Sequence, residues 1–294
     1  MIVLGTMRSG TSLAAELIRL WGASSGGENN LWKSDVNDPR GYGYMEYIPL
    51  QELNDELLDH NDRVPPPRTR LEEKALDPAF REKALMLLQQ MDDQSERAGF
   101  DAWVWKDARL PLTLPFWTAL WEDPIYVITV RHPAEVALSS ARTEEMDPND
   151  VPFSAGFIYW QYCMLKILAF TQQSQQKMFI AYDQLVNDPM RECTRLCQFL
   201  DQHSGKSTEG SQKRIEAMLP QVVGNQRHYH YGKALADMEQ ATREQRALYD
   251  FLRVKIMYPD ESFQESDFAL YPGWREYLQA MDMVLTLSQS YKDE

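Results

Sequence analysis

The first residues of the chain constrain its fold more than any other segment. Residues 1–4 form a short apolar run with β-branched side chains that ends at Gly5, and this pattern predicts a buried strand. After the turn that follows, Thr11 or Ser12 can cap a helix whose apolar side chains recur at helical spacing. A buried strand, a turn with glycines and a helix in this order favour an α/β fold with a parallel sheet.

Apolar runs and helical patterns alternate along the rest of the chain. Further strands are predicted at residues 102–105, 125–130 and 178–181. Helices are predicted at residues 47–59 and 79–98, from Pro133 onward, at residues 154–171, and from Asp188-Pro189 to Leu200. This alternation predicts a P-loop-like parallel sheet flanked by helices on both faces. Residues 1–294 are expected to form one domain, with a helical C-terminal cap from about residue 205 on one edge of that domain.

The charge balance disfavours two classes of partner. The chain has 44 Asp and Glu against 30 Lys and Arg, a net charge of −14 that is spread along its length. Such a surface repels nucleic-acid phosphates and anionic lipid head groups at long range, so no nucleic-acid or membrane partner is expected. An anionic ligand would have to be held by a few local cations inside a pocket.

The sequence gives no indication of a membrane span, a signal peptide or a metal site. No run of about 18 apolar residues occurs, and Arg8 and Arg19 interrupt the apolar N-terminal stretch. Cys163, Cys193 and Cys197 have no nearby His or further thiol that would complete a metal site, which favours buried, reduced thiols. A sparse and odd number of cysteines suits a reducing compartment, so the cytoplasm is the expected location.

The turn between the first strand and the first helix has the features of a phosphate cradle. Its sequence is Gly5-Thr6-Met7-Arg8-Ser9-Gly10-Thr11-Ser12. The glycines allow a close backbone approach, and a helix N-terminus offers N–H groups and a positive dipole end to a phosphate. Hydroxyls of Ser9, Thr11 and Ser12 add donors, and Arg8 adds charge. A kinase-type P-loop has Lys where this sequence has Thr11, and the next buried strand ends in Arg131, where an NTPase can carry an acidic magnesium residue. The loop is therefore expected to be a phosphate cradle without that metal machinery. The plainer alternative is a serine-rich turn with a surface arginine.

A second motif follows a later predicted strand. Arg131 stands at the end of that strand, Pro133 opens a helix, and Ser139 comes eight residues after the arginine, two turns into the helix. On its own, this pattern is also that of an ordinary helix start.

Together, the two motifs resemble the 5′-phosphosulfate loop and the 3′-phosphate motif of sulfotransferases that use 3′-phosphoadenosine 5′-phosphosulfate (PAPS). The resemblance implies that the residues of the loop bind the 5′-phosphosulfate and that Arg131 and Ser139 hold the 3′-phosphate. The implied loop residues are Arg8, Ser9, Gly10, Thr11 and Ser12. His132 departs from the Asp or Asn that is usual in the family, at a position that is not a phosphate ligand in the pattern.

Weaker matches extend the resemblance to about residue 190. The segment from Trp105 to Leu110 is similar to the Lys-Asp-Pro-Arg-Leu or Lys-Thr-His stretches of relatives. Tyr182 lies in a segment that resembles the family's Tyr-Glu-Asp-Leu, where the tyrosine is near the adenine. Residues 37–42, followed by Glu46, are similar to Asn-Pro-x-Gly-[YF]-x-Glu stretches of bacterial members.

The resemblance implies direct sulfuryl transfer to a small-molecule hydroxyl or amine. Arg8 and Lys106 are expected to stabilise the charge that grows on the leaving and transferring oxygens. Glu46 is the favoured general base, with Asp107 next and Glu28 or His60 as weaker candidates. Glu46 could equally be a solvated carboxylate at a helix entry, and Asp107 could instead orient Lys106 or Arg109 by a charge pair.

A late segment and the acceptor are less constrained. In the family, a basic segment near the end of the chain folds back onto the 3′-phosphate and adenine, and Arg227 and His228 could supply it here, or could belong to a loop that connects helices. The acidic chain suits a cationic or neutral acceptor, such as the saxitoxin-type guanidinium alkaloids that some relatives sulfate, with steroids, phenols and glycans as alternatives. Competing hypotheses are a P-loop small-molecule kinase and a non-catalytic nucleotide-binding protein of the same fold.

Overall fold

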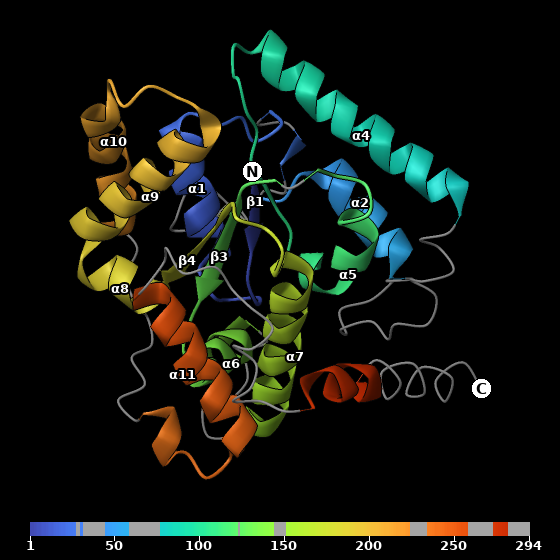
Figure 1. Ribbon diagram of the computed structural model, residues 1–294, viewed down its shortest axis with the longest axis vertical. Helices are drawn as coiled ribbons and strands as arrows, with labels where there is room; N and C mark the ends of the chain where they lie inside the picture. Colours follow the sequence, from blue (N-terminus) through green and yellow to red (C-terminus); the bar gives the residue numbers. More distant parts are fainter. Residues whose placement is uncertain are drawn as a thin grey trace.

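Four parallel strands form a single sheet at the centre of the molecule (Figure 1). The computed structural model describes residues 1–27, 30–31, 45–58, 77–122, 124–143, 151–223, 234–257 and 273–281. The strands are β1 (Ile2–Leu4), β2 (Trp105–Lys106), β3 (Tyr126–Val130) and β4 (Lys177–Ala181). They lie in the order β2-β1-β3-β4 and all neighbours are parallel, which confirms the predicted α/β class.

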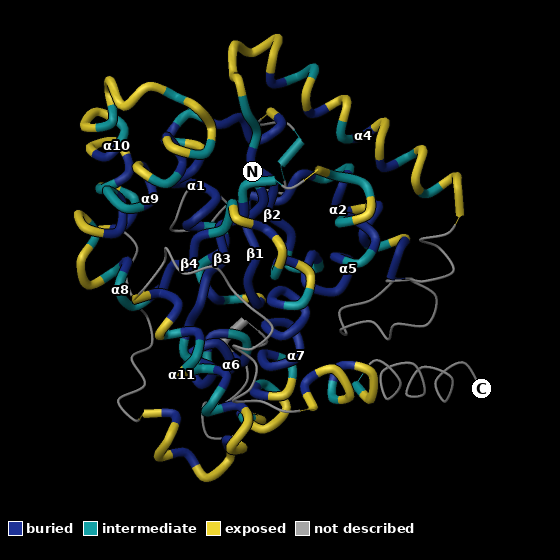
Figure 2. Tube along the Cα trace, viewed as in Figure 1, coloured by how far each residue is buried: buried dark blue, intermediate teal, exposed yellow. Residues whose placement is uncertain are grey.

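The sheet is covered by helices on both faces because its short strands are apolar on both sides. Ile2 and Leu4 belong to one core and Val3, between them, to the other, as alternation along a strand requires. The helices whose side chains join the core of Ile2 and Leu4 are α2 (Ile48–Leu57), α4 (Pro78–Arg97), α5 (Leu110–Trp117), α6 (Pro133–Thr143), α7 (Phe153–Thr171) and α11 (Arg243–Met257). Those on the side of Val3 are α1 (Thr11–Trp21), α8 (Tyr182–Asn187), α9 (Pro189–Ser204) and α10 (Ser211–Val223). Figure 2 shows the strands buried between these layers and the outer face of α4 exposed.

The described chain after residue 205 is mostly helical, and its helices join the cores on both faces of the sheet. The helix α10 packs against α9 and α1, and α11 packs beside β4 and against α7. A short 3₁₀ helix, η3 (Leu235–Asp237), precedes α11, and residues 274–281 are again helical. None of the helices in the described part of the chain combines the length and hydropathy needed to cross a membrane.

Two local predictions need correction. The strand predicted at residues 102–105 is β2 at Trp105–Lys106, preceded by an isolated bridge between Ser24 and Trp103. The helix α5 was not predicted, because Leu110–Trp117 is apolar on all sides and shows no helical periodicity. It is buried between its neighbours, so it needs no polar face.

The predicted capping of the first helix by Thr11 or Ser12 is also wrong. The N-cap of α1 is Gly10, at φ 97°, and no side chain caps this helix. A Cβ at this position would come within 2.5 Å of the ring of Tyr182, so the site excludes any larger residue on steric as well as backbone grounds. The loop therefore enters α1 with the helix N-terminus uncapped by side chains, as a phosphate site requires.

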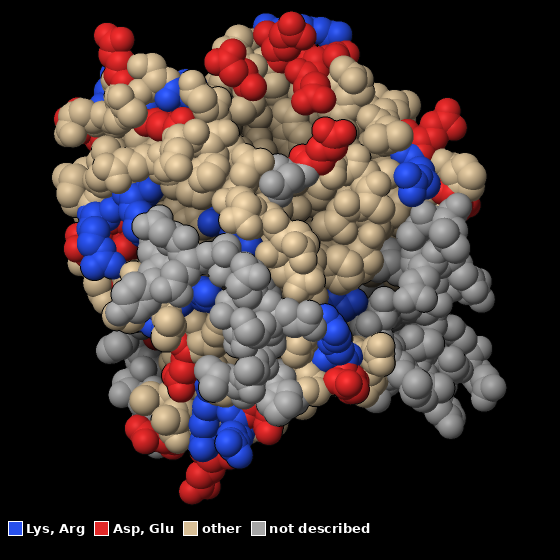
Figure 3. Space-filling view, viewed as in Figure 1, with Lys and Arg blue, Asp and Glu red and all other residues tan. Residues whose placement is uncertain are grey.

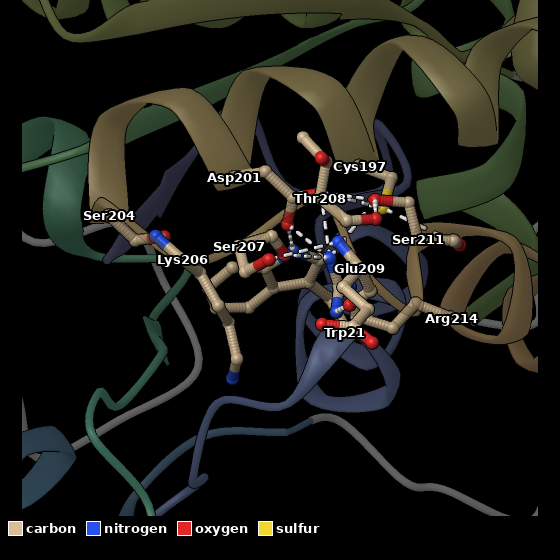
Figure 4. Close-up of polar contacts among 10 residues, drawn as sticks. All are labelled: Trp21, Cys197, Asp201, Ser204, Lys206, Ser207, Thr208, Glu209, Ser211 and Arg214. Carbon is tan, nitrogen blue, oxygen red and sulfur yellow. Dashed lines mark hydrogen bonds and ion pairs between the residues drawn. The ribbon is translucent and has the colours of Figure 1, made fainter.

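A buried carboxylate ties α9 and α10 to the C-terminal end of α1 (Figure 4). Asp201 accepts hydrogen bonds from Trp21 Nε1 at 2.7 Å and from Ser211 Oγ at 2.6 Å. It also pairs with Arg214, whose Nη2 lies 2.8 and 2.7 Å from its two oxygens. Burial tends to raise the pKa of Asp201, but the hydrogen bonds from Ser211, Arg214 and Trp21 outweigh it, and the net effect lowers the pKa.

We expect Asp201→Ala to lower the free energy of unfolding by about 3 kcal/mol, because it leaves the partly buried Arg214 without its carboxylate. Lys83→Ala, which removes an exposed ion pair with Glu56, is the control and should cost less than about 1 kcal/mol. Urea unfolding of both variants measures the difference. Since the folded-state pKa is depressed, the contribution of Asp201 is present above about pH 4 and should be lost as the pH falls through the folded value. Equal losses in the two variants would contradict this account of the cluster.

Candidate functional site at the carboxyl ends of the strands

The residues predicted to carry function follow the carboxyl ends of all four strands. The loop 5–10 follows β1, Lys106 ends β2, Arg131 follows β3 and Tyr182 follows β4. The strand order reverses between β1 and β3, since β1 connects onward to β2 on one side and β3 to β4 on the other. In open α/β sheets, ligands bind outside the carboxyl ends of the strands at such a point of reversal.

The loop after β1 is held from within by its own hydroxyls. Ser9 Oγ donates to the carbonyl of Thr6 at 2.6 Å and lies 2.7 Å from Thr129 Oγ1 on β3. A Cβ on Gly5 would come within 2.2 Å of Thr129 Oγ1, so glycine is required for this approach. The hydroxyl of Ser9 therefore shapes the loop, which differs from the prediction that it stands ready as a phosphate donor. Thr6 Oγ1 is buried without a hydrogen-bond partner, a polar atom that a bound anion could satisfy.

Arg8, Ser139 and Arg131 meet beside this loop. Arg8 Nε donates to Ser139 Oγ at 3.0 Å, and Arg131 Nη1 donates to the backbone carbonyl of Arg8 at 3.1 Å. Arg8 has a φ of 65°, in the left-handed region that is uncommon for a residue with a side chain. Arg131 and Ser139, eight residues apart, therefore both contact Arg8. The helix α6 (Pro133–Thr143) brings Ser139 back to the loop.

Tyr182, the first residue of α8 after β4, packs against the loop and against Arg131. Its ring packs against Gly10, and the Arg131 guanidinium lies over it, 4.3 Å from the ring centroid. Such a cation–π contact fixes the plane of the guanidinium. Arg131 Nε also donates to Glu135 Oε2 at 3.1 Å, so the cation is buried with a paired carboxylate. The sequence motif did not assign a role to Glu135.

The second group surrounds the end of β2. Lys106 Nζ donates to Glu46 Oε1 at 2.8 Å, and the side chains are only 4% and 10% exposed. The backbone N–H of Ala108 reaches the same oxygen at 3.4 Å. The favoured base and a predicted catalytic cation therefore form one buried ion pair, although 60 residues separate them in the sequence. Glu46 is not a solvated carboxylate at a helix entry.

Asp107 is held by donors on both of its oxygens. Oδ2 accepts from Asn54 Nδ2 at 2.7 Å, and Oδ1 accepts from the backbone N–H of Arg109 at 2.8 Å and from its Nη1 at 3.2 Å. Asp55 on α2 pairs with Arg109 in turn. Burial, and then the nearby Glu46 carboxylate, raise the pKa of Asp107, while Arg109 and Asn54 act in the opposite direction. Asn54 was missed by sequence reasoning, although a polar residue among Leu50, Leu53 and Leu57 on a buried helix face was a usable signal.

The remaining predicted residues are placed as follows. Thr11 begins α1 and is buried, and Ser12 follows it at intermediate exposure. Arg227 and His228, and the weaker base candidates Glu28 and His60, lie outside the described residues. Three aromatic side chains of α7, Phe157, Trp160 and Tyr162, are buried, and Tyr159 is partly buried.

The site cations are separate from the surface charge. Figure 3 shows acidic side chains gathered over the upper end of α4 and basic side chains scattered over this face. Lys106 and Arg131 are instead buried. Each of these buried cations is paired with a buried carboxylate, Lys106 with Glu46 and Arg131 with Glu135, and Arg131 also reaches the loop that precedes α1. The described residues contain no cluster of His, Cys, Asp and Glu arranged to hold a metal ion.

Comparison with known proteins identifies the family. A model of the sulfotransferase family matches residues 1–203, and comparison with curated proteins gave no match. A sulfotransferase domain from the curacin biosynthetic pathway is 17% identical over 68% of this chain and 73% of that one, with a TM-score of 0.38. A sulfotransferase domain from the Synechococcus PCC 7002 olefin synthase is 19% identical over 92% and 91%, with a TM-score of 0.40. The Mycobacterium avium sulfotransferase STF9 is 15% identical over 95% and 76%, with a TM-score of 0.45. At these TM-scores, the assignment depends on the family model, which covers more than half of the chain: this protein belongs to the sulfotransferase family.

Proposed function

We propose that this sulfotransferase transfers the sulfuryl group of PAPS to a hydroxyl or amine of a small molecule. The observation that carries the proposal is the meeting of Arg8, Arg131 and Ser139 beside an uncapped helix N-terminus at the point where the strand order reverses. Two separated anionic groups on one nucleotide would match this arrangement. The 5′-phosphosulfate would bind to the loop and the start of α1, and the 3′-phosphate to Arg131 and Ser139.

Under this proposal, the loop after β1 and the motif from Arg131 to Ser139 both bind the donor. The orphaned hydroxyl of Thr6 and the N-terminal N–H groups of α1 would donate to the 5′-phosphosulfate together with Arg8, Thr11 and Ser12. The ring of Tyr182 would border the adenine, on the side where it already supports Arg131. Residues 227–228 are proposed to close over the 3′-phosphate, as the resemblance implies.

Lys106 and Glu46 are proposed to carry the chemistry. The donor supplies an activated sulfuryl group whose bridging oxygen gains negative charge as it leaves. Lys106, with Arg8, would stabilise that charge, and Glu46 would accept the acceptor's proton. The contacts favour Glu46 over Asp107 as base, because three donors already occupy the two oxygens of Asp107.

The charges near the end of β2 support a cationic or neutral acceptor. Glu46, Asp55 and Asp107 face Lys106 and Arg109, which leaves an excess of negative charge on the described part of this wall. A small natural product with amine or guanidinium groups would suit such a wall. The three cysteines are free and buried, which supports the cytoplasm as the compartment.

The donor is tested by ligand-induced stabilisation. We expect 3′,5′-ADP to raise the melting temperature of the protein well above any shift given by ATP with magnesium, since the site binds two separated phosphates. The 5′-AMP control lacks the 3′-phosphate that Arg131 and Ser139 would hold, so its shift should be smaller. An equal or larger shift with ATP and magnesium would contradict PAPS as donor. Binding of 3′,5′-ADP without turnover of PAPS with any acceptor would favour a non-catalytic protein.

Substitution of the two buried cations should have different effects, one mainly on donor affinity and the other mainly on kcat. Arg131→Ala removes a charged partner of the 3′-phosphate and should weaken 3′,5′-ADP binding by about 1.5–3 kcal/mol. Lys106→Ala should lower kcat about 100-fold or more with a smaller effect on affinity, because its charge matters most as the leaving oxygen gains charge. Titration calorimetry and steady-state rates measure the two effects. The reverse pattern would exchange the two roles.

The general base is tested by amide substitutions that preserve shape. Glu46→Gln removes the proton acceptor and should lower kcat by about 100-fold or more, while 3′,5′-ADP binding persists. Asp107→Asn is the matched comparison, at a carboxylate whose oxygens are already occupied by donors. If Glu46→Gln kept normal turnover while Asp107→Asn lost it, the base would be Asp107.

A further inference from the structure

The buried amide of Asn54 has an orientation that its neighbours determine. Asn54 is wholly buried on α2, between Asp107 at the end of β2 and Trp117 on α5. The indole N–H of Trp117 can only donate, so the atom facing it at 2.8 Å must be the amide oxygen of Asn54. The NH₂ group therefore faces Asp107 at 2.7 Å, and Asp107 Oδ2 must accept that bond. Both ends of the amide are satisfied in a location where an unmade bond would be costly.

Asp107, in turn, determines where two donors to Glu46 lie. Lys106 and Ala108 are its immediate neighbours in the chain, and Lys106 Nζ and Ala108 N–H both reach Glu46 Oε1. With Asp107 anchored to Asn54 on one oxygen and to Arg109 on the other, this stretch of backbone has little freedom to shift. The direction of the amide thus bears on the position of the Lys106–Glu46 pair through the hydrogen bond to Asp107 and the backbone that joins Asp107 to Lys106 and Ala108.

We propose that Asn54 is a positioning residue for sulfuryl transfer, acting through Asp107 on Lys106 and Glu46. The role rests on the proposed function of that pair. An apolar residue of similar size would fill the same space between α2, β2 and α5, and it would leave Asp107 Oδ2 and the Trp117 N–H without their partner. Displacement of a catalytic group by about 1 Å can cost 100-fold in rate.

The test uses three variants and an assay that needs no acceptor. Asn54→Leu removes both hydrogen bonds, and Leu53→Ala destabilises the same helix at a buried apolar residue outside the network. PAPS hydrolysis by water, 3′,5′-ADP affinity and melting temperature are measured for each. Asn54→Leu should lower kcat about 10–100-fold while 3′,5′-ADP affinity stays within about threefold of the parent. Leu53→Ala should lower the melting temperature about as much as Asn54→Leu does, but its kcat per folded molecule should equal that of the parent.

A pH profile separates positioning from packing. Asn54→Asp places a second carboxylate against Asp107. The charged groups already around Asp107 are Glu46, which precedes α2, and Arg109, which follows two residues later in the chain. Asp55 on α2 pairs with Arg109 and is therefore also near. The new pair can share one proton at low pH and keep a hydrogen bond, but it becomes doubly charged and separates as the pH rises. The kcat of Asn54→Asp should therefore fall by about tenfold between about pH 6 and 8.5 relative to the parent.

The outcomes distinguish this proposal from the proposed function. Parent protein that neither binds 3′,5′-ADP nor hydrolyses PAPS would overturn the donor assignment itself. The positioning role alone would be overturned by the following result: the parent protein is active, the kcat of Asn54→Leu is within twofold of the parent value, and the pH profile of Asn54→Asp runs parallel to that of the parent. Equal loss of kcat per folded molecule in Asn54→Leu and Leu53→Ala would also overturn it, since packing would then account for the effect.

Discussion

The close approach of the loop after β1 to β3 and to the first residue after β4 is the constraint on which the site depends. Gly5 lies against Thr129 on β3, and Gly10 lies against the ring of Tyr182 after β4, with no room for a Cβ at either position. These contacts place the N-terminus of α1 beside the ends of β3 and β4. Arg131 then reaches both the loop carbonyl of Arg8 and the face of Tyr182 from one position. A larger residue at either glycine would separate the loop from Thr129 and Tyr182.

The site concentrates buried charge in a protein that is acidic overall. Lys106 and Arg131 are each buried with a carboxylate, Glu46 and Glu135 respectively. Charges removed from water are costly unless they are paired and hydrogen-bonded, so each cation needs its partner in the absence of an anion. The pairing also holds each cation in one orientation. The stabilisation of the fold and the orientation of the site thus depend on the same contacts.

The polar network at the end of β2 links the site to the rest of the fold. Asn54 on α2 joins Trp117 on α5 to Asp107, and Asp107 lies next to Lys106. The apolar core around α2 and α5 therefore determines where a predicted catalytic cation stands. A network with both ends of its central amide satisfied specifies one arrangement more strictly than apolar packing would, because any shift leaves a buried polar atom unpaired.

The sequence by itself determined the elements and the residue types of the site. Apolar runs ending at Gly5, Lys106 and Arg131 predicted the parallel strands, because buried strands of such sheets are apolar on both faces. The resemblance implied that Arg131 and Ser139 act on one group, and in the structure both side chains contact Arg8, Ser139 at its Nε and Arg131 at its backbone carbonyl. Only the tertiary structure could show that Asp107 has donors on both of its oxygens, whereas Lys106 and Ala108 both reach Oε1 of Glu46. That distinction depends on donors from Asn54, on a helix more than 50 residues away, and no local pattern encodes a pairing made by the packing of α2 against β2 and α5.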